Sequence, residues 1–190
     1  MVKAQFSPKI RKELAYMDLQ ELFLRRQSCR DFTQEVVSTD DVLYCLEAAR
    51  LAPSACNAQP YHLIVCRGDT ARAVAAATQG MGMNSFTKNV PCFVVVAEDD
   101  YNRTAAVGSR LKGQDYRSVD IGLAVSQLCL MAEERGLGSC ILGWFDEAKL
   151  QNLLHTQRRI RLVVALGHAA EGYPIRKKQR KPLSELVEFR

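Results

Sequence analysis

Basic residues gather in two short segments near the ends of the chain, in patterns that could bind an anion. Arg26, Ser28 and Arg30 alternate in "RRQSCR", so an extended or turning backbone would place both guanidinium groups and the hydroxyl on one side. Lys178 and Arg180 alternate similarly in "RKKQRK". If the two segments converge, charge-assisted hydrogen bonds worth about 1.5–3 kcal/mol each would hold a phosphate dianion. Spacing alone slightly favours two separate, solvated clusters.

A polar turn, "APSACNAQP" at residues 52–60, could hold a planar heterocycle. Ser54, Asn57 and Gln59 offer hydrogen-bond donors and acceptors, and Pro53 and Pro60 stiffen the backbone that carries them. A flavin needs such partners along its carbonyl and ring-nitrogen edge, because these hydrogen bonds tune the electronics of the cofactor.

Other catalytic templates fit the chain poorly. It has no G-x-S-x-G motif, and the favoured interpretation of His62 is an ordinary strand residue rather than a base for Cys56. Residues 108–113 have the glycine spacing of a phosphate loop, but Gln and Asp follow where Lys and Ser or Thr would be required. The segment 136–143 lacks the third glycine of a dinucleotide fingerprint and follows a predicted helix.

Composition indicates one globular domain spanning all 190 residues, with 47% hydrophobic and 25% charged residues. No apolar run is long enough for a membrane span and the start lacks a signal peptide's apolar core, so we expect a cytoplasmic protein without a membrane partner. Seven cysteines without a C-x-x-C pair predict neither a disulfide framework nor a metal site. Basic residues with interleaved aromatics are absent, which disfavours nucleic acid as a partner.

Alternating helices and strands must position these segments. The hydrophobic period predicts helices over 18–26, 38–52, 70–79, 116–136 and 146–155, and strands over 61–67, 91–99, 139–144 and 160–169. Ser38 starts the second helix, Pro53 stops it, and Gly136 ends the longest one. Residues 99–116 form a polar connection. The closing "LSELVEF" alternates, so it could add to a sheet edge, possibly that of another chain.

With these segments in place, the sequence resembles the nitroreductase family of FMN-dependent oxidoreductases. Four segments carry the resemblance in the family's order: "RRQSCRDF" (25–32), "APSACNAQPYHLIV" (52–65), "GLGSCILGWFDE" (136–147) and "KKQRKPLSELV" (177–187). Two features depart from the family. Tyr61 stands where Trp is more usual, and the 99–116 connection is short where larger members insert helices that cover the substrate.

The resemblance implies an FMN site built from several parts of the chain. On one side, the residues that would meet the phosphate and the ribityl chain or flavin edge are Arg26, Gln27, Ser28 and Arg30. On the other side, Lys178 and Arg180 would meet the phosphate. The residues expected beside the isoalloxazine, usually from the second subunit, are Pro53, Ser54, Ala55 and Asn57. Gln59 of the same turn is a candidate cofactor-binding residue from its side chain rather than from the resemblance. Leu142 and Gly143 would approach the reactive N5 region.

The resemblance further implies an α+β fold, with a central mixed sheet flanked by helices, in a homodimer with two FMN sites at its interface. Residues 1–17 would be an N-terminal extension, and the C-terminal tail, residues 172–190, would pack on the partner subunit. The expected reaction passes a hydride from NADH or NADPH to flavin N5 and then electrons to an electron-poor acceptor such as a nitroaromatic or quinone. No catalytic side chain or metal is required. Alternatives are dehalogenation or flavin consumption on the same fold or, less favoured, an anion- or nucleic-acid-binding module.

Overall fold

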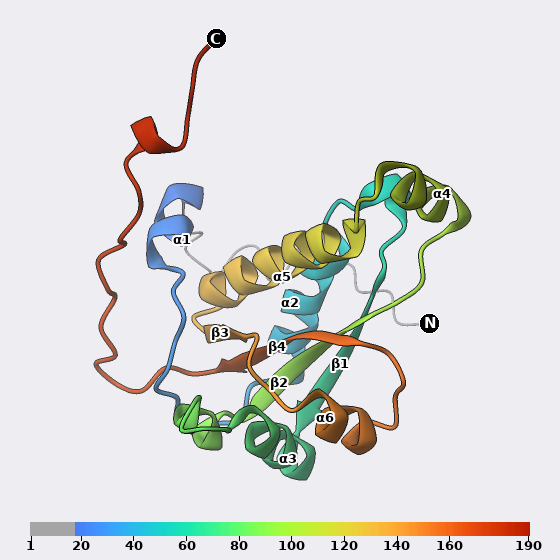
Figure 1. Ribbon diagram of the computed structural model, residues 1–190. Coiled ribbons are helices and arrows are strands. Elements are labelled where there is room, and N and C mark those ends of the chain that lie inside the picture. The colour runs from blue at the N-terminus through green and yellow to red at the C-terminus, as the bar shows by residue number, and fades with distance from the viewer. Residues whose placement is uncertain (1–17) are drawn as a thin grey trace.

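The centre of the molecule is a four-stranded antiparallel sheet, seen here in a computed structural model that describes residues 18–190 (Figure 1). The strand order is β1-β2-β4-β3. The strands are β1 (Tyr61–Arg67), β2 (Cys92–Glu98), β3 (Gly138–Leu142) and β4 (Ile160–Gly167). The inner strand β2 is buried on both faces, which explains its nearly unbroken apolar sequence.

The sheet is less mixed than the resemblance implied. All three strand pairs are antiparallel, and within residues 18–190 the only parallel pairing is an isolated bridge between Ser28 and Ser139. The connection after β1 explains this arrangement. This connection, which contains helix α3 (Gly68–Thr78), returns the chain to the end of the sheet that it left, so β2 starts at Cys92 opposite Arg67, the last residue of β1.

Helices cover both faces of the sheet. On one face α2 (Thr39–Arg50) and α5 (Tyr116–Glu134) share a core with Val94 and Val96 of β2. On the other face α3 and α6 (Glu147–Leu153) cover Phe93 and Val95, as the alternation of a strand requires. The α+β fold class is therefore confirmed. Among the described residues, no helix is both long and apolar enough to cross a membrane.

Local sequence signals account for the helix ends. The Ser38 hydroxyl accepts a hydrogen bond from the Asp41 N–H at 3.0 Å and caps α2 as predicted. Gly136 follows α5 with a φ of +71°, a left-handed conformation that glycine adopts without a Cβ clash. Helix α3 ends at Thr78. The segment around Arg26 begins where the short α1 (Leu19–Arg25) stops.

The 99–116 connection, predicted from the sequence as a short polar link, contains a helix, α4 (Arg103–Lys112). The Asn102 side chain accepts a hydrogen bond from the Ala105 N–H at 2.9 Å at its start, and Gly113 ends it with a φ of +61°. Ala105 is the one fully buried residue of α4, so no apolar stripe marked the helix in the sequence.

The C-terminal tail leaves β4 and runs beside α1 before projecting away from the domain (Figure 1). Its "LSELVEF" segment forms a short 3₁₀ helix (Leu183–Glu185) in this chain rather than a strand. All four of its apolar side chains, those of Leu183, Leu186, Val187 and Phe189, are exposed. Packing of this tail on a partner subunit stays a prediction, as does the single-domain boundary; the predicted extension, residues 1–17, lies outside the described residues.

Candidate functional site

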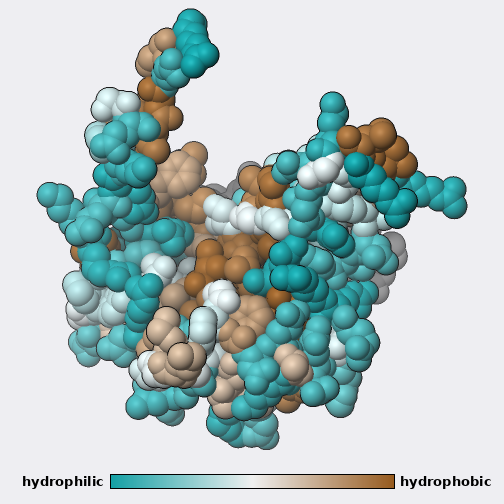
Figure 2. Space-filling model, in the orientation of Figure 1, coloured by the Kyte–Doolittle hydropathy of each residue, from teal (hydrophilic) through white to brown (hydrophobic). Residues whose placement is uncertain are grey.

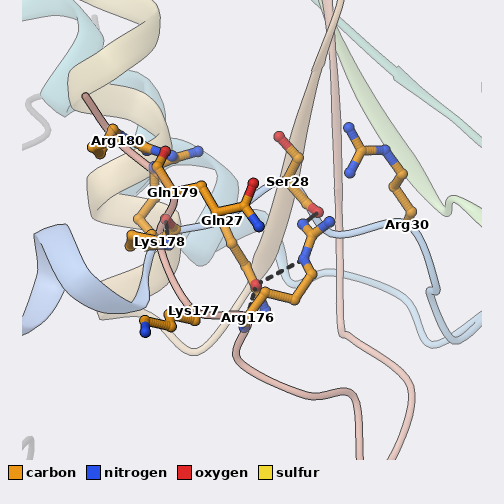
Figure 3. A pocket seen from close by; sticks show the side chains of 9 residues that line it. Gln27, Ser28, Arg30, Arg176, Lys177, Lys178, Gln179 and Arg180 are labelled. Atoms are coloured by element: carbon orange, nitrogen blue, oxygen red, sulfur yellow. Dashed lines mark hydrogen bonds between the residues drawn. The ribbon is translucent and has the colours of Figure 1, made fainter.

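The two basic segments converge on one cleft of about 590 Å³ (Figure 3). Nine residues line it: Arg26, Gln27, Ser28 and Arg30 from the first segment, and Arg176, Lys177, Lys178, Gln179 and Arg180 from the tail. The alternative of two separate solvated clusters, which spacing alone slightly favoured, is therefore wrong. About 150 residues separate the two segments in sequence, and where they meet six cationic residues line one cleft. Four of these six, Arg26, Arg30, Lys178 and Arg180, were predicted from the sequence.

The first segment is fixed against the edge strand β3. Ser28 bridges Ser139, and the Cys29 N–H donates to the Ser139 carbonyl at 2.8 Å. Cys29 itself is buried beneath the segment. A Cβ on Gly138 would meet Cys29 Cβ at 2.9 Å, closer than such atoms approach in proteins. The second glycine of "GLGS" is thus required so that the Arg26–Arg30 backbone can lie against β3.

Gln27 fastens the tail to this segment. Its side-chain amide donates to the Pro174 carbonyl at 2.8 Å, and its oxygen accepts from the N–H of Arg176 at 3.0 Å and from the Arg176 Nε at 3.2 Å. Lys178 Nζ donates to the Arg26 carbonyl at 2.6 Å. The Gln27 side chain therefore holds the two segments of the cleft together, and the contact with the cofactor that the resemblance implies for Gln27 stays a prediction.

Arg176 is the main cleft residue that the sequence analysis missed. Its Nη2 donates to the Ser28 carbonyl at 2.5 Å, so its guanidinium crosses from the tail to the first segment (Figure 3). The sequence pattern singled out Lys178 and Arg180, because alternate residues of an extended chain point to the same side. The only available signal for Arg176 was its membership of the continuous basic run, which did not distinguish it from Lys177.

The cleft is strongly cationic. Six of its lining residues carry a positive charge and none is a carboxylate. Within residues 18–190 none of these six forms a salt bridge. Burial, together with the positive charges of Arg26 and Arg180, lowers the pKa of the Lys178 ammonium. Such a cluster of uncompensated charge is stabilised by an anion, and most strongly by a dianion such as a phosphate monoester.

The polar turn lies away from the cleft, near the opposite end of α5 (Figure 1). Arg25, beside the cleft, contacts Glu133 at the end of α5, whereas the Ala55 N–H of the turn donates to Asp120 near its start. One chain therefore does not bring Pro53, Ser54, Ala55, Asn57 and Gln59 to the predicted phosphate site. The resemblance assigned Pro53, Ser54, Ala55 and Asn57 to the second subunit, and that assignment stays a prediction.

Within the turn, the predicted ligand-binding side chains bond to one another. Gln59 Nε2 donates to Asn57 Oδ1 at 3.0 Å, and the Gln59 N–H donates to Ser54 Oγ at 3.0 Å. Cys56, Asn57 and Gln59 have φ values of 50°, 51° and 47°, in the left-handed region that side-chained residues rarely occupy. No hydrogen bond within residues 18–190 joins Cys56 to His62, so the nucleophile–base alternative gains no support.

Leu142 and Gly143 lie at the end of β3, and neither lines the cleft. The Leu142 side chain is buried in the core, so only its backbone could meet a ligand. Gly143 is exposed, and no atom lies within 4 Å of the place that its Cβ would occupy. Among the described residues, no three His, Cys, Asp or Glu side chains gather as a metal ion would require.

The fold and the site together define an α+β protein with a strongly cationic cleft beside the edge strand of an antiparallel sheet. The Nitroreductase family model matches residues 24–168, which is most of the chain. The chain therefore belongs to the nitroreductase family, and the family and oxidoreductase class predicted from the sequence are confirmed.

Individual relatives cover nearly the whole chain. An iodotyrosine deiodinase of Thermotoga neapolitana is 28% identical over 181 residues, covering 89% of this chain and 95% of the relative. An NADH dehydrogenase of Thermus thermophilus is 29% identical, with 93% and 98% covered. A nitroreductase from Desulfovibrio desulfuricans, solved in complex with FMN, superposes with a TM-score of 0.74 at 27% identity, covering 92% of this chain and 97% of that one.

Proposed function

We propose that this protein is an FMN-dependent oxidoreductase that passes electrons from NADH or NADPH through the flavin to an electron-poor acceptor such as a nitroaromatic or quinone. The observation that carries the proposal is the cleft, which is lined by six cationic residues and no carboxylate and is therefore suited to bind an anion. Family membership supports the choice of FMN over other phosphate compounds, as do the FMN complex of the structural relative and the nicotinamide donor of the NADH dehydrogenase relative.

The residues of the cleft fit the phosphate end of FMN. A phosphate monoester dianion would relieve the repulsion among Arg26, Lys178 and Arg180, which contributes to the lowered pKa of Lys178. The Ser28 hydroxyl and the guanidinium groups supply the donors that phosphate oxygens accept. A cleft of about 590 Å³ is also within the usual size of a cofactor site.

The ring end of the cofactor would be completed by a second copy of the chain. Cleft and turn lie at opposite ends of α5, so two copies related by a twofold axis could each bring a turn to the other's cleft (Figure 1). Apolar residues gather on the face between the tail and α4 (Figure 2). Val119 and Leu123 of α5 are exposed, with 50% and 41% of their surface accessible. Such an apolar face is typical of a protein-protein interface.

In this mechanism the protein binds and orients, and contributes no nucleophile. Bound FMN would supply the redox chemistry, taking a hydride from the nicotinamide and returning electrons to the acceptor. Arg26, Ser28 and Arg180 would anchor the phosphate, and Ser54 and Asn57 of the partner would present hydrogen-bond groups to the ring edge. A fixed phosphate and a fixed ring edge together set which face of the cofactor the donor and the acceptor reach in turn.

The absorption spectrum of the purified protein tests this proposal. We expect a yellow protein with an FMN spectrum that bleaches when NADH or NADPH is added without oxygen. A colourless protein that cannot be reconstituted with FMN would refute the proposal. Salt-sensitive retention on DNA or RNA in such a flavin-free protein would instead favour the binding-module alternative.

Reductive dehalogenation is a second candidate, favoured by the similarity to an iodotyrosine deiodinase along 89% of the chain. It would use the same cleft and turn but a different acceptor. Product analysis separates the two functions. The reduced protein is offered a halogenated tyrosine and, separately, a nitroaromatic; halide release indicates dehalogenation, and loss of nitro absorbance indicates nitroreduction.

A further inference from the structure

Two side chains from outside the polar turn hold adjacent backbone groups within it. The Ala55 N–H donates to Asp120 Oδ1 of α5 at 3.1 Å. The carbonyl of the next residue, Cys56, accepts from Asn102 Nδ2 at 2.9 Å. We call these two hydrogen bonds the tethers of the turn. One holds a backbone N–H and the other a backbone carbonyl, so together they fix the orientation of the backbone at residues 55 and 56.

The geometry of the turn explains why it needs such tethers. Cys56, Asn57 and Gln59 have left-handed backbone conformations, and a side-chained residue stays in one only when its surroundings hold it there. The hydrogen bonds inside the turn run between residues 54 and 59. The Ala55 N–H and the Cys56 carbonyl instead form their hydrogen bonds with Asp120 and Asn102, which lie outside the turn.

Asp120 is an unusual residue for a purely structural contact. It is 2% exposed, and its second oxygen, Oδ2, has no hydrogen-bond partner within residues 18–190. Burial raises the pKa of its carboxyl group. Asp120 lies among the buried apolar residues of α5, where an apolar side chain would avoid the cost of burying a carboxyl group. What Asp120 provides that an apolar residue could not is the hydrogen bond to the Ala55 N–H.

Asn102 joins the turn to α4. Its Oδ1 accepts from the Ala105 N–H and caps α4, while its Nδ2 holds the turn, so both ends of one amide are used. The neighbouring Tyr101 anchors the same point: its hydroxyl donates to Asp115 at 3.0 Å and accepts from the Arg117 N–H at 2.7 Å. The start of α4 is therefore fixed to both α5 and the turn.

We propose that Asp120 and Asn102 are positioning residues that orient the Ser54–Gln59 turn toward the cofactor and hold α4 at a fixed place beside it. The proposal rests on the proposed function, because the turn is taken to face the flavin of the partner subunit. Helix α4 lies in the connection where larger family members carry inserts. Because Asn102 couples α4 to the turn, α4 would help to shape the acceptor pocket.

The Asn102→Asp variant tests the hydrogen bond to the turn independently of the hydrogen bond that caps α4. Aspartate keeps an oxygen for the Ala105 N–H but loses the donor to the Cys56 carbonyl. In the flavin-free full-length protein we expect roughly fivefold to tenfold faster amide hydrogen exchange in residues 53–60, the effect of losing about one hydrogen bond. Asp146→Asn is the matched control, since Asp146 caps α6 by accepting from the Lys149 N–H at 3.0 Å. Unchanged exchange in Asn102→Asp would overturn the tether.

Substitutions at Asp120 test the other tether. Asp120→Asn keeps an acceptor of the same shape, and we expect exchange in residues 53–60 close to that of the wild type. Asp120→Ala removes the acceptor, and we expect exchange faster by about fivefold to tenfold. Equal exchange in folded Asp120→Ala and in the wild type would overturn the role of Asp120. If Asp120→Ala does not fold, Asp120→Ser provides the same comparison with a hydroxyl too short to reach Ala55.

Binding and kinetic measurements decide whether the tethers act on the site. For Asn102→Asp we expect FMN to bind about threefold more weakly and the KM of a nitroaromatic to rise severalfold, with kcat nearly unchanged, because the tether contributes only part of one hydrogen bond's net worth. Faster exchange with unchanged FMN affinity and unchanged KM would overturn the positioning role. Failure of the wild type itself to bind FMN would refute the proposed function, while the exchange results would still stand.

Discussion

The basic cleft and the polar turn differ in how much of each site a single chain completes. The cleft is assembled within one chain, where Gln27, Arg176 and Lys178 fasten its two segments together. The turn is shaped within the same chain but lies near the other end of α5, away from the cleft. Under the proposed function, one chain would bind the anionic end of the cofactor, while the ring end would require a second copy of the chain. Loss of cleft residues should affect cofactor retention in every oligomeric state, whereas loss of turn residues should matter only in the dimer.

The largest effect is expected from removing charge in the cleft. Arg26→Ala and Arg30→Ala should each weaken FMN binding about tenfold to a hundredfold, because a hydrogen bond to a charged group is worth about 1.5–3 kcal/mol. Fluorescence titration of the flavin-free protein with FMN measures the change. Arg72→Ala is the control, since Arg72 is exposed and pairs with Asp69 on α3. If both cleft variants retain FMN like the wild type, the phosphate site has been misplaced.

A somewhat smaller effect is expected where the first basic segment packs against β3. Gly138→Ala places a Cβ 2.9 Å from Cys29 Cβ and 3.0 Å from its Sγ, so the first segment must shift away from β3. Overpacking of this kind should lower the free energy of unfolding by about 1–3 kcal/mol. Urea denaturation measures it. Gly108→Ala in α4 meets no atom within 4 Å and should stabilise the protein by about 0.5–1 kcal/mol; equal effects of the two changes would contradict the steric argument.

A third prediction concerns the fastening of the tail. Gln27→Ala removes its hydrogen bonds to Pro174 and Arg176, each worth about 1 kcal/mol net. Trypsin should then cut the 176–181 segment several times faster, at its lysine and arginine residues. The matched control is Gln151→Ala, which loses a bond to the Arg158 carbonyl in another loop. Tail cleavage at the wild-type rate in Gln27→Ala would show that the remaining contacts suffice to hold the tail.

The two regions also differ in what the sequence could predict. Strand β1 was predicted at its observed ends, because its apolar run is long and bounded by turn residues. Convergence of the cleft segments could not be derived from spacing, since it depends on hydrogen bonds between distant parts of the chain, such as those from Arg176 to Gln27 and from Lys178 to Arg26. Helix α4 was missed because it is stabilised by caps rather than by an apolar face. Asp120 was hidden inside the α5 stripe, where only the fold reveals that it reaches Ala55.

The smallest expected effect is the pH dependence that Lys178 gives to the cleft but not to the turn. In the free protein, burial and the charges of Arg26 and Arg180 lower the pKa of Lys178, whereas a bound phosphate favours its ammonium form. FMN binding therefore takes up a proton above the lowered pKa, and affinity should fall as pH rises toward about 10.4, the ordinary pKa of lysine. Lys178→Arg stays charged throughout this range, so the FMN affinity of this variant should fall less than that of the wild type over the same interval. If FMN affinity fell equally with pH in the wild type and in Lys178→Arg, Lys178 would not face the phosphate. The arginines of the cleft alone would then bind the anion.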